Sequence, residues 1–161
     1  MYWHEVDFSR IQKKDGRAGR QSFTYDGKPF RFQIPAGLCV WGLSEYNALS
    51  VQTDDEFRTW FQRLEEAIGK PEPFSSNLRE DLLRIKVDDY TQVFDANRQL
   101  DLSERVEGAF RGHVLRCIME VSGMYYFNGT YGLTCRIYQM LVEELAEPQD
   151  ECAFILPPPA S

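Results

Sequence analysis

The sequence feature that most constrains the fold is an almost continuous apolar run at residues 114–121, which leads into the dipeptide Asn128-Gly129. Such a run is typical of a central β-strand with both faces covered. Asn-Gly tolerates the positive φ angles that a two-residue hairpin turn requires. Together these signals predict a long β-hairpin in the last third of the chain, with Asn128 and Gly129 at its turn.

Shorter strand patterns precede this hairpin. Asp26-Gly27 is a second dipeptide typical of hairpin turns, and strand-like runs flank it on both sides. Pro29 cannot donate a hydrogen bond to a sheet, so the second of these runs is expected at an edge. The sequence predicts short strands at residues 21–25, 30–34, 49–53, 83–87 and 92–95.

One helix has start and stop signals at both ends. Residues 53–56, Thr-Asp-Asp-Glu, have the pattern of a capping box, and apolar residues then recur at helical spacing as far as Ile68. Gly69 and Pro71 follow as stop signals. A second, shorter helix is expected at residues 101–111, where Leu102, Val106 and Phe110 would share one stripe.

This order of elements predicts a mainly β fold with one or two helices, in the α+β class. Five or six curved antiparallel strands with an intervening helix fit a small, partly open Greek-key barrel of the OB type. A two-sheet sandwich is the alternative architecture. We divide the chain into a basic N-terminal arm or flexible loop at residues 1–20, an OB-like single domain at 21–142 and an acidic, proline-rich C-terminal tail at 143–161.

Composition agrees with one folded acidic domain. The 161 residues include 18 Lys and Arg against 25 Asp and Glu, a net charge of −7, and this length suits a single core. The charges are segregated: residues 1–40 are net basic, whereas every charged residue within 141–161 is acidic. No apolar run approaches the roughly 18 residues of a membrane span, and residues 1–10 do not resemble a secretion signal. We therefore expect an intracellular protein without membrane partners.

The sequence contains no pattern that indicates catalysis. It has no glycine-rich phosphate loop, nucleophile elbow or His-Glu-x-x-His motif. The four cysteines lie singly, which excludes the usual zinc spacing and favours reduced thiols. Asp54-Asp55 and Asp88-Asp89 are better explained by a helix N-terminus and a strand-end turn. We expect no enzyme activity, no metal and no cofactor.

The predicted hairpin divides its side chains between two faces. If Asn128 and Gly129 form the turn, Phe127 faces Thr130 and Tyr125 faces Gly132. Strand alternation then predicts a core face with Met124, Tyr126, Tyr131, Leu133, Cys135 and Ile137. It predicts an outer face with Tyr125, Phe127, Thr130, Gly132, Thr134, Arg136 and Tyr138. Flat rings beside a cation suit the stacking of single-stranded bases, but the pattern alone favours packing under a helix or contact with a protein.

Residues 113–140 resemble the closing motif of single-stranded DNA-binding proteins from nucleocytoplasmic large DNA viruses. In that family an apolar strand leads to Gly, an aromatic pair, Asn and a turn, followed by aromatic-Gly, a hydroxyl residue, a basic residue and Gln. The matching positions here are Gly123, 125–127, Asn128, 131–134, Arg136 and Gln139. Weaker similarity at residues 41–44, 64–66, 83–87 and 91–94 extends the resemblance over residues 30–142.

The resemblance implies an OB-fold protein that coats single strands during viral DNA replication, repair or recombination. Our leading hypothesis is therefore a non-catalytic single-strand binder, with DNA favoured over RNA. Tyr125, Phe127 and Tyr138 would stack bases, and the candidate phosphate contacts are Arg136, Arg84, Lys86, Arg31 and Arg116, with the basic arm closing over the strand.

Further expectations concern partners and location. The acidic tail would recruit replication proteins, the chain would be able to form a homo-oligomer, and a viral protein of this kind would act in the host nucleus or at a cytoplasmic replication site. The alternative hypothesis is a viral structural or regulatory module that uses the same aromatic face to bind a protein.

Overall fold

A computed structural model describes residues 1–143 of the chain. Strands dominate it, and there is one α-helix, α1 (Asp55–Ala67). Three single-turn 3-10 helices lie near the N-terminus: η1 (Trp3–Glu5), η2 (Phe8–Arg10) and η3 (Arg17–Gly19). The strands are β1 (Ile11–Asp15), β2 (Gln21–Tyr25), β3 (Lys28–Pro29), β4 (Arg31–Gln33), β5 (Gly37–Trp41), β6 (Ala48–Gln52), β7 (Phe74–Ser75), β8 (Leu78–Arg79), β9 (Leu82–Lys86), β10 (Gln92–Phe94), β11 (Val114–Phe127) and β12 (Thr130–Val142).

Five of these strands pair in a closed circuit. β11 pairs with β5, β5 with β6, β6 with β9, β9 with β12, and β12 returns to β11. The β9–β12 pairing is parallel and the other four are antiparallel. A five-stranded Greek-key barrel is the architecture expected of an OB fold. The predicted mainly β, OB-like fold class is therefore confirmed.

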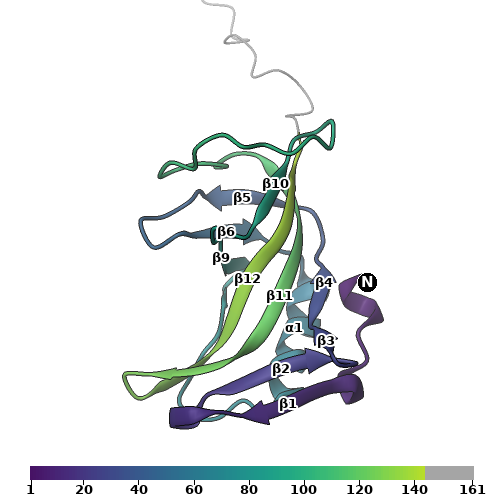
Figure 1. The fold of residues 1–161 in the computed structure, drawn as a ribbon, viewed down its shortest axis with the longest axis vertical. Helices are drawn as coiled ribbons and strands as arrows, with labels where there is room; N and C mark the ends of the chain where they lie inside the picture. The colour runs from purple at the N-terminus through teal and green to yellow at the C-terminus, as the bar shows by residue number, and fades with distance from the viewer. Residues whose placement is uncertain (144–161) are drawn as a thin grey trace, which may run out of the picture.

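The long β11–β12 hairpin has the predicted turn and register. Phe127 pairs with Thr130 and Tyr125 with Gly132, and Asn128 and Gly129 have φ angles of 50° and 77°, as a type I′ turn requires. Figure 1 shows this hairpin crossing the front of the molecule, with its turn projecting at the lower left. Two irregularities in the register lie between Ile118 and Met119 and between Val121 and Gly123.

The first half of β11 is covered on one face only. Cys117, Met119 and Val121 point into the core and are almost fully buried, whereas Arg116 is exposed and Glu120 is partly exposed. The prediction of a strand covered on both faces is therefore wrong. β11 is central because it bonds to several strands, not because a layer covers each of its faces.

The N-cap of helix α1 lies one residue after Thr53, the N-cap of the predicted capping box. Asp54 is the N-cap, and its side chain accepts a hydrogen bond of 2.7 Å from the amide of Phe57. Thr53 instead donates its hydroxyl to the carbonyl of Asp81. The helix buries Phe57, Phe61 and Leu64 in the core, as its apolar spacing predicts.

Aromatic and aliphatic side chains fill the core. Three cysteines, Cys39, Cys117 and Cys135, are buried free thiols, and burial raises the pKa of Cys39 to about 11 and that of Cys117 to about 12. Cys152 lies outside the described residues, as do residues 144–161 of the predicted acidic tail. The largest fully buried side chains are Phe30, Phe32, Phe57, Phe61, Leu49, Leu64, Ile68, Leu83, Ile85, Leu115, Met119 and Ile137.

Residues 1–20 pack against the rest of the fold, which differs from the expected arm or flexible loop. β1 pairs with β2 over five residue pairs, from Ile11–Tyr25 to Asp15–Gln21. Trp3 packs on helix α1, with its ring 5.6 Å from that of Phe57 and 5.4 Å from that of Trp60. The pairing of β1 uses backbone groups, so a polar and basic composition did not prevent it.

The second predicted helix is absent from the described chain, where residues 101–106 are irregular and 107–112 form turns. The side chain of Asp101 accepts a hydrogen bond of 2.9 Å from the amide of Ser103, a local bond that competes with helix formation. Leu102 is 84% exposed and Val106 is 59% exposed. Leu102 and Val106 of the predicted stripe therefore do not pack on the core, and short helices depend on such packing.

Residues 1–143 contain no helix with the length and apolar content needed to cross a membrane.

Candidate nucleic-acid interface

The outer face of β9 carries two cations. Leu83 and Ile85 point into the core and are fully buried, so strand alternation directs Arg84 and Lys86 outward, where both are exposed. Within the described chain, no carboxylate lies within ion-pairing distance of either cation. Both positive charges are therefore available to an external anion.

The β11–β12 hairpin places an aromatic ring beside these cations. Tyr125, Thr134, Arg84 and Lys86 line one open cavity of about 380 Å³. Arg79 from β8 and the segment 75–77 also line it. We call the surface formed by Arg79, Arg84, Lys86, Tyr125 and Thr134 the β9 face. The structure thus brings the predicted site residue Tyr125 beside Arg84 and Lys86, which lie about forty positions earlier in the sequence.

A glycine sets the position of the Tyr125 ring. Tyr125 lies opposite Gly132 on the paired strand, and a Cβ atom at Gly132 would fall 2.3 Å from the Tyr125 hydroxyl oxygen and 2.4 Å from Cζ. The ring therefore lies across Gly132, where no other residue would leave room. Tyr125 retains 36% exposure, and Phe127 at the end of the strand retains 66%. Both rings offer surface for stacking.

The predicted inward position of Tyr126 is wrong. Its side chain is 41% exposed, and its ring lies 4.7 Å from that of Tyr131. Met124 and Leu133, nearer the barrel, are buried as predicted. The reason is that the end of the hairpin projects beyond the barrel (Figure 1), where Tyr126 packs on the ring of Tyr131 and not in the core.

Two other predicted phosphate contacts, Arg31 and Arg136, are held by carboxylates. Arg31 Nε donates to Glu120 Oε1 at 2.8 Å and Arg136 Nε donates to Glu120 Oε2 at 3.1 Å. Asp88 lies 3.5 Å from Arg136 Nε, and the guanidinium of Arg31 lies 3.7 Å from the centre of the Tyr138 ring. We call Arg31, Asp88, Glu120, Arg136 and Tyr138 the Glu120 cluster. Its two positive and two negative charges cancel.

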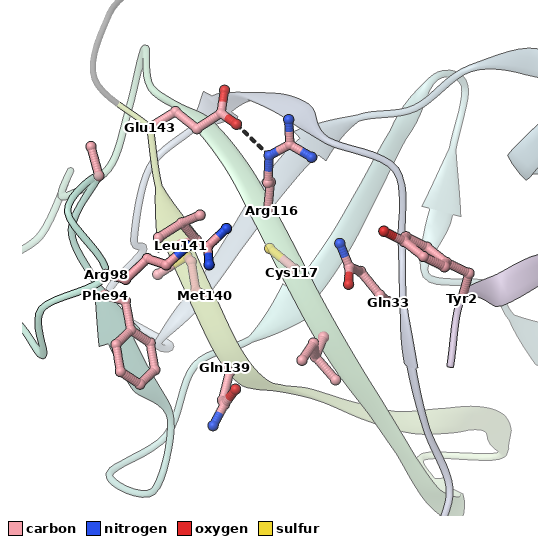
Figure 2. A pocket seen from close by; sticks show the side chains of 12 residues that line it. Tyr2, Gln33, Phe94, Arg98, Arg116, Cys117, Gln139, Met140, Leu141 and Glu143 are labelled. Atoms are coloured by element: carbon pink, nitrogen blue, oxygen red, sulfur yellow. Dashed lines mark hydrogen bonds and ion pairs between the residues drawn. The ribbon is translucent and has the colours of Figure 1, made fainter.

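The last predicted phosphate contact, Arg116, lies at another part of the hairpin. It is ion-paired with Glu143 and lines an open pocket of about 970 Å³ together with Tyr2, Gln33 and Leu141. Figure 2 shows the Arg116–Glu143 pair at one end of this pocket. None of the residues of the β9 face lines this pocket, so Arg116 is not part of the same surface.

Two exposed aromatic residues at the β5–β6 connection escaped the sequence-based prediction of the site. Trp41 at the end of β5 is 59% exposed, and Tyr46 in the β5–β6 connection is 71% exposed. The guanidinium of Arg111 lies 5.7 Å from the centre of the Trp41 ring. The amide of Val87, next to Lys86, donates to the carbonyl of Asn47, so this connection adjoins the end of β9. The sequence signal that could have identified them is the presence of aromatic residues at and after the end of a strand, where they have no core to pack in.

A buried carboxyl group lies next to the segment that walls the β9 face. Glu65 of helix α1 is 2% exposed, bonds to Ser76, and has one oxygen without a hydrogen-bond partner in the described structure. Burial raises the pKa of Glu65, and the bond to Ser76 and the charge of Lys70 oppose that rise. A group of three or more His, Cys, Asp or Glu arranged to hold a metal is not found among residues 1–143.

Structures of similar fold come from a bacteriophage. The single-stranded DNA-binding protein of bacteriophage Enc34 matches with a TM-score of 0.54 and 10% identity, over 90% of this chain and 96% of that chain. A C-terminal truncation of it matches with a TM-score of 0.54 and 8% identity, over 87% and 98%. Its complex with single-stranded DNA matches with a TM-score of 0.53 and 8% identity, over 88% and 99%. The chain shares the fold of this phage protein. No protein-family model and no curated protein matches the sequence.

Proposed function

We propose that this chain is a non-catalytic single-stranded DNA-binding protein and that the bound DNA strand lies along the β9 face. The observation that carries the proposal is the cavity where the Tyr125 ring, laid across Gly132, adjoins the unpaired cations Arg84 and Lys86. Stacking on an aromatic ring and phosphate contact are the two interactions that a single strand requires. Phe127 would extend the stacking surface to the end of the hairpin.

The position of this surface in the fold supports the proposal. OB folds bind oligonucleotides on the face of their second and third strands, between the loop that joins the first two strands and the loop that joins the last two. The corresponding elements here are β6 and β9, the β5–β6 connection and the β11–β12 hairpin. A protein of the same fold has been solved in complex with single-stranded DNA. Trp41 and Tyr46 join the candidate site on this ground.

We also propose the finer role that the sequence resemblance implies. The chain would coat single strands in viral DNA replication, repair or recombination, with DNA favoured over RNA. Replication proteins recruited by the acidic tail, homo-oligomers and a location at viral replication sites belong to the same proposal, and they rest on the sequence alone.

Fluorescence anisotropy with labelled single-stranded and duplex oligonucleotides, at two salt concentrations, tests the proposal. We expect preferential binding of the single strand that weakens as salt rises, because phosphate contacts release counterions. Tyr125→Ala should weaken binding, whereas Tyr2→Ala, which removes an exposed tyrosine from the pocket of Arg116, should not. Binding that ignores salt, or that favours the duplex, would contradict the proposal and favour an aromatic interface for a protein.

A further inference from the structure

Glu120 occupies a position between two arginines that the sheet itself fixes. On β11, Glu120 is directly opposite Arg31 of β4 on one side and Arg136 of β12 on the other. Each carboxylate oxygen accepts a hydrogen bond from a different arginine, at 2.8 and 3.1 Å. Neighbouring strands hold outward side chains at fixed spacing, so this contact is built into the register.

The arginines remain accessible while Glu120 holds them. The side chains of Arg31 and Arg136 are 34% and 20% exposed, whereas that of Glu120 is 12% exposed. A guanidinium has five N–H donors, and Glu120 accepts from only the Nε of each arginine. An anion arriving from solvent can therefore approach both guanidinium groups, although Glu120 occupies their Nε donors and offsets their charge.

The cluster lies next to the proposed path of the DNA. Arg136 is in register with Lys86 across the β9–β12 pairing. Lys86 of the β9 face and Arg136 of the Glu120 cluster are therefore neighbours on adjacent strands. A single strand on the β9 face would present its phosphates beside two arginines that already bind a carboxylate. Arginine recognises carboxylates and phosphates with the same hydrogen-bonding geometry.

We propose that Glu120 is an internal competitor of DNA phosphates that limits the affinity of this chain for single strands. This inference rests on the proposed function. Glu120 binds Arg31 and Arg136 in the free protein, and a phosphate gains the uncompensated charge of these arginines only by displacing its carboxylate. Glu120 thus acts through the two arginines and is a positioning residue rather than a contact to DNA.

The test compares Glu120→Gln with Asp26→Asn in the full-length chain. Asp26 is ion-paired with Arg10 at the β2–β3 turn, so Asp26→Asn removes the same charge elsewhere, and asparagine tolerates the positive φ angle of 52° found there. Affinity for a labelled single-stranded oligothymidine is measured over a series of salt concentrations. Thermal unfolding of each variant is followed in parallel.

We expect Glu120→Gln to bind the oligonucleotide more tightly at low salt, by about threefold for each arginine released. The slope of log affinity against log salt should steepen by about 0.7 for each additional phosphate neutralised. Asp26→Asn should leave the slope unchanged. The gain should vanish when Glu120→Gln is combined with Arg31→Gln and Arg136→Gln. If Glu120→Gln does not fold, Asp88→Asn, which removes the second carboxylate beside Arg136 but leaves Glu120 bound to it, should produce a gain smaller than that of one released arginine, and no gain would contradict the inference.

Three results would overturn the inference. These are equal gains from Glu120→Gln and Asp26→Asn, an unchanged slope in a folded Glu120→Gln variant, and a gain that persists without the two arginines. Suppose that one of these results is found, but the wild-type chain binds single strands and Tyr125→Ala weakens that binding. Then only the proposed role of Glu120 is rejected. If wild-type chain does not bind single strands, both proposals are lost.

Discussion

The β9 face and the Glu120 cluster contain the same kinds of side chain but differ in charge. The β9 face has three outward cations and the Glu120 cluster has two, each region has one tyrosine, and the two regions adjoin along the β9–β12 pairing. Arg84 and Lys86 have no carboxylate partner in the described chain, whereas Arg31 and Arg136 share Glu120. Tyr125 lies against a glycine, whereas Tyr138 has an arginine over its ring. One region is free to bind a polyanion, and the other already contains its own anion.

This difference teaches that an outward cation on a strand is not by itself a phosphate contact. Partly buried ion pairs are worth more than exposed ones, and breaking them leaves a charge without its partner. A phosphate must therefore displace Glu120 before it gains Arg31 or Arg136, whereas it meets only water at Arg84 and Lys86. We expect the two regions to respond differently to the same substitutions.

The largest difference should appear when each tyrosine is removed. Tyr125→Ala should weaken single-strand binding by about 1–3 kcal/mol, because a base stacked on an aromatic ring contributes that much. Tyr138→Ala should cost less, because the guanidinium of Arg31 already lies 3.7 Å from its ring. Anisotropy titrations at one salt concentration compare the two. Equal losses would show that the stacking surface continues across the Glu120 cluster and would remove the distinction between the regions.

A smaller effect is expected from removing charge. Arg84→Gln with Lys86→Gln should reduce the slope of log affinity against log salt by about 1.4, since each phosphate contact to a single strand contributes about 0.7. Arg31→Gln with Arg136→Gln should leave the slope nearly unchanged and instead lower the thermal stability, because Glu120 and Asp88 lose their partners. The same salt titration serves both double variants. A similar loss of slope in the second pair would mean that phosphates displace Glu120 readily.

A still smaller effect should follow from filling the space under Tyr125. In Gly132→Ala the new Cβ would overlap the ring, so the ring must leave its place. Binding should weaken by less than in Tyr125→Ala, since the displaced ring can still contact a base. In the Tyr125→Ala background the same substitution should have almost no further effect, because the two changes act on one contact. An additive loss in the double variant would mean that Gly132 acts independently of the ring.

Local signals predicted much of this molecule. The type I′ turn at Asn128-Gly129 fixes the pairing of every residue near it, so the contact between Tyr125 and Gly132 was predictable. The start and stop signals of α1 located the helix to within one residue at its N-terminus. The predicted helix at residues 101–111 is absent because Leu102 and Val106 of its stripe do not pack on the core, and a local pattern does not show which residues will find a packing surface. The tail at 144–161 and its expected role are outside the described residues.

Long-range charge pairing was the part that the sequence could not supply. Arg31 and Glu120 are 89 positions apart, and only the β4–β11 register brings them together. The sequence identified Arg31, Arg84, Lys86, Arg116 and Arg136 as equivalent basic residues. Their separation into free and paired cations depends on which acids face them across strands, and that depends on the completed barrel.

The smallest expected effect concerns Glu65, a carboxyl group without a cation hydrogen-bonded to it, next to the β9 face. Burial raises the pKa of Glu65 in the folded state, so folding takes up a proton between the unfolded and folded pKa values. Its contribution to stability therefore grows as the pH falls through the folded pKa and is complete below the unfolded one. Glu65→Gln should abolish this component.

Denaturant unfolding of wild-type chain and Glu65→Gln, measured at neutral pH and at successively lower pH, isolates this component because all other carboxyl groups are common to both. The variant should be relatively more stable at neutral pH, and the difference should shrink as the pH falls. Its affinity for single strands should stay unchanged, since Glu65 is buried and does not reach the solvent side of the β9 face. If binding changes with stability intact, the charge of Glu65 reaches Arg84 and Lys86, and the β9 face is then not a surface of wholly uncompensated cations.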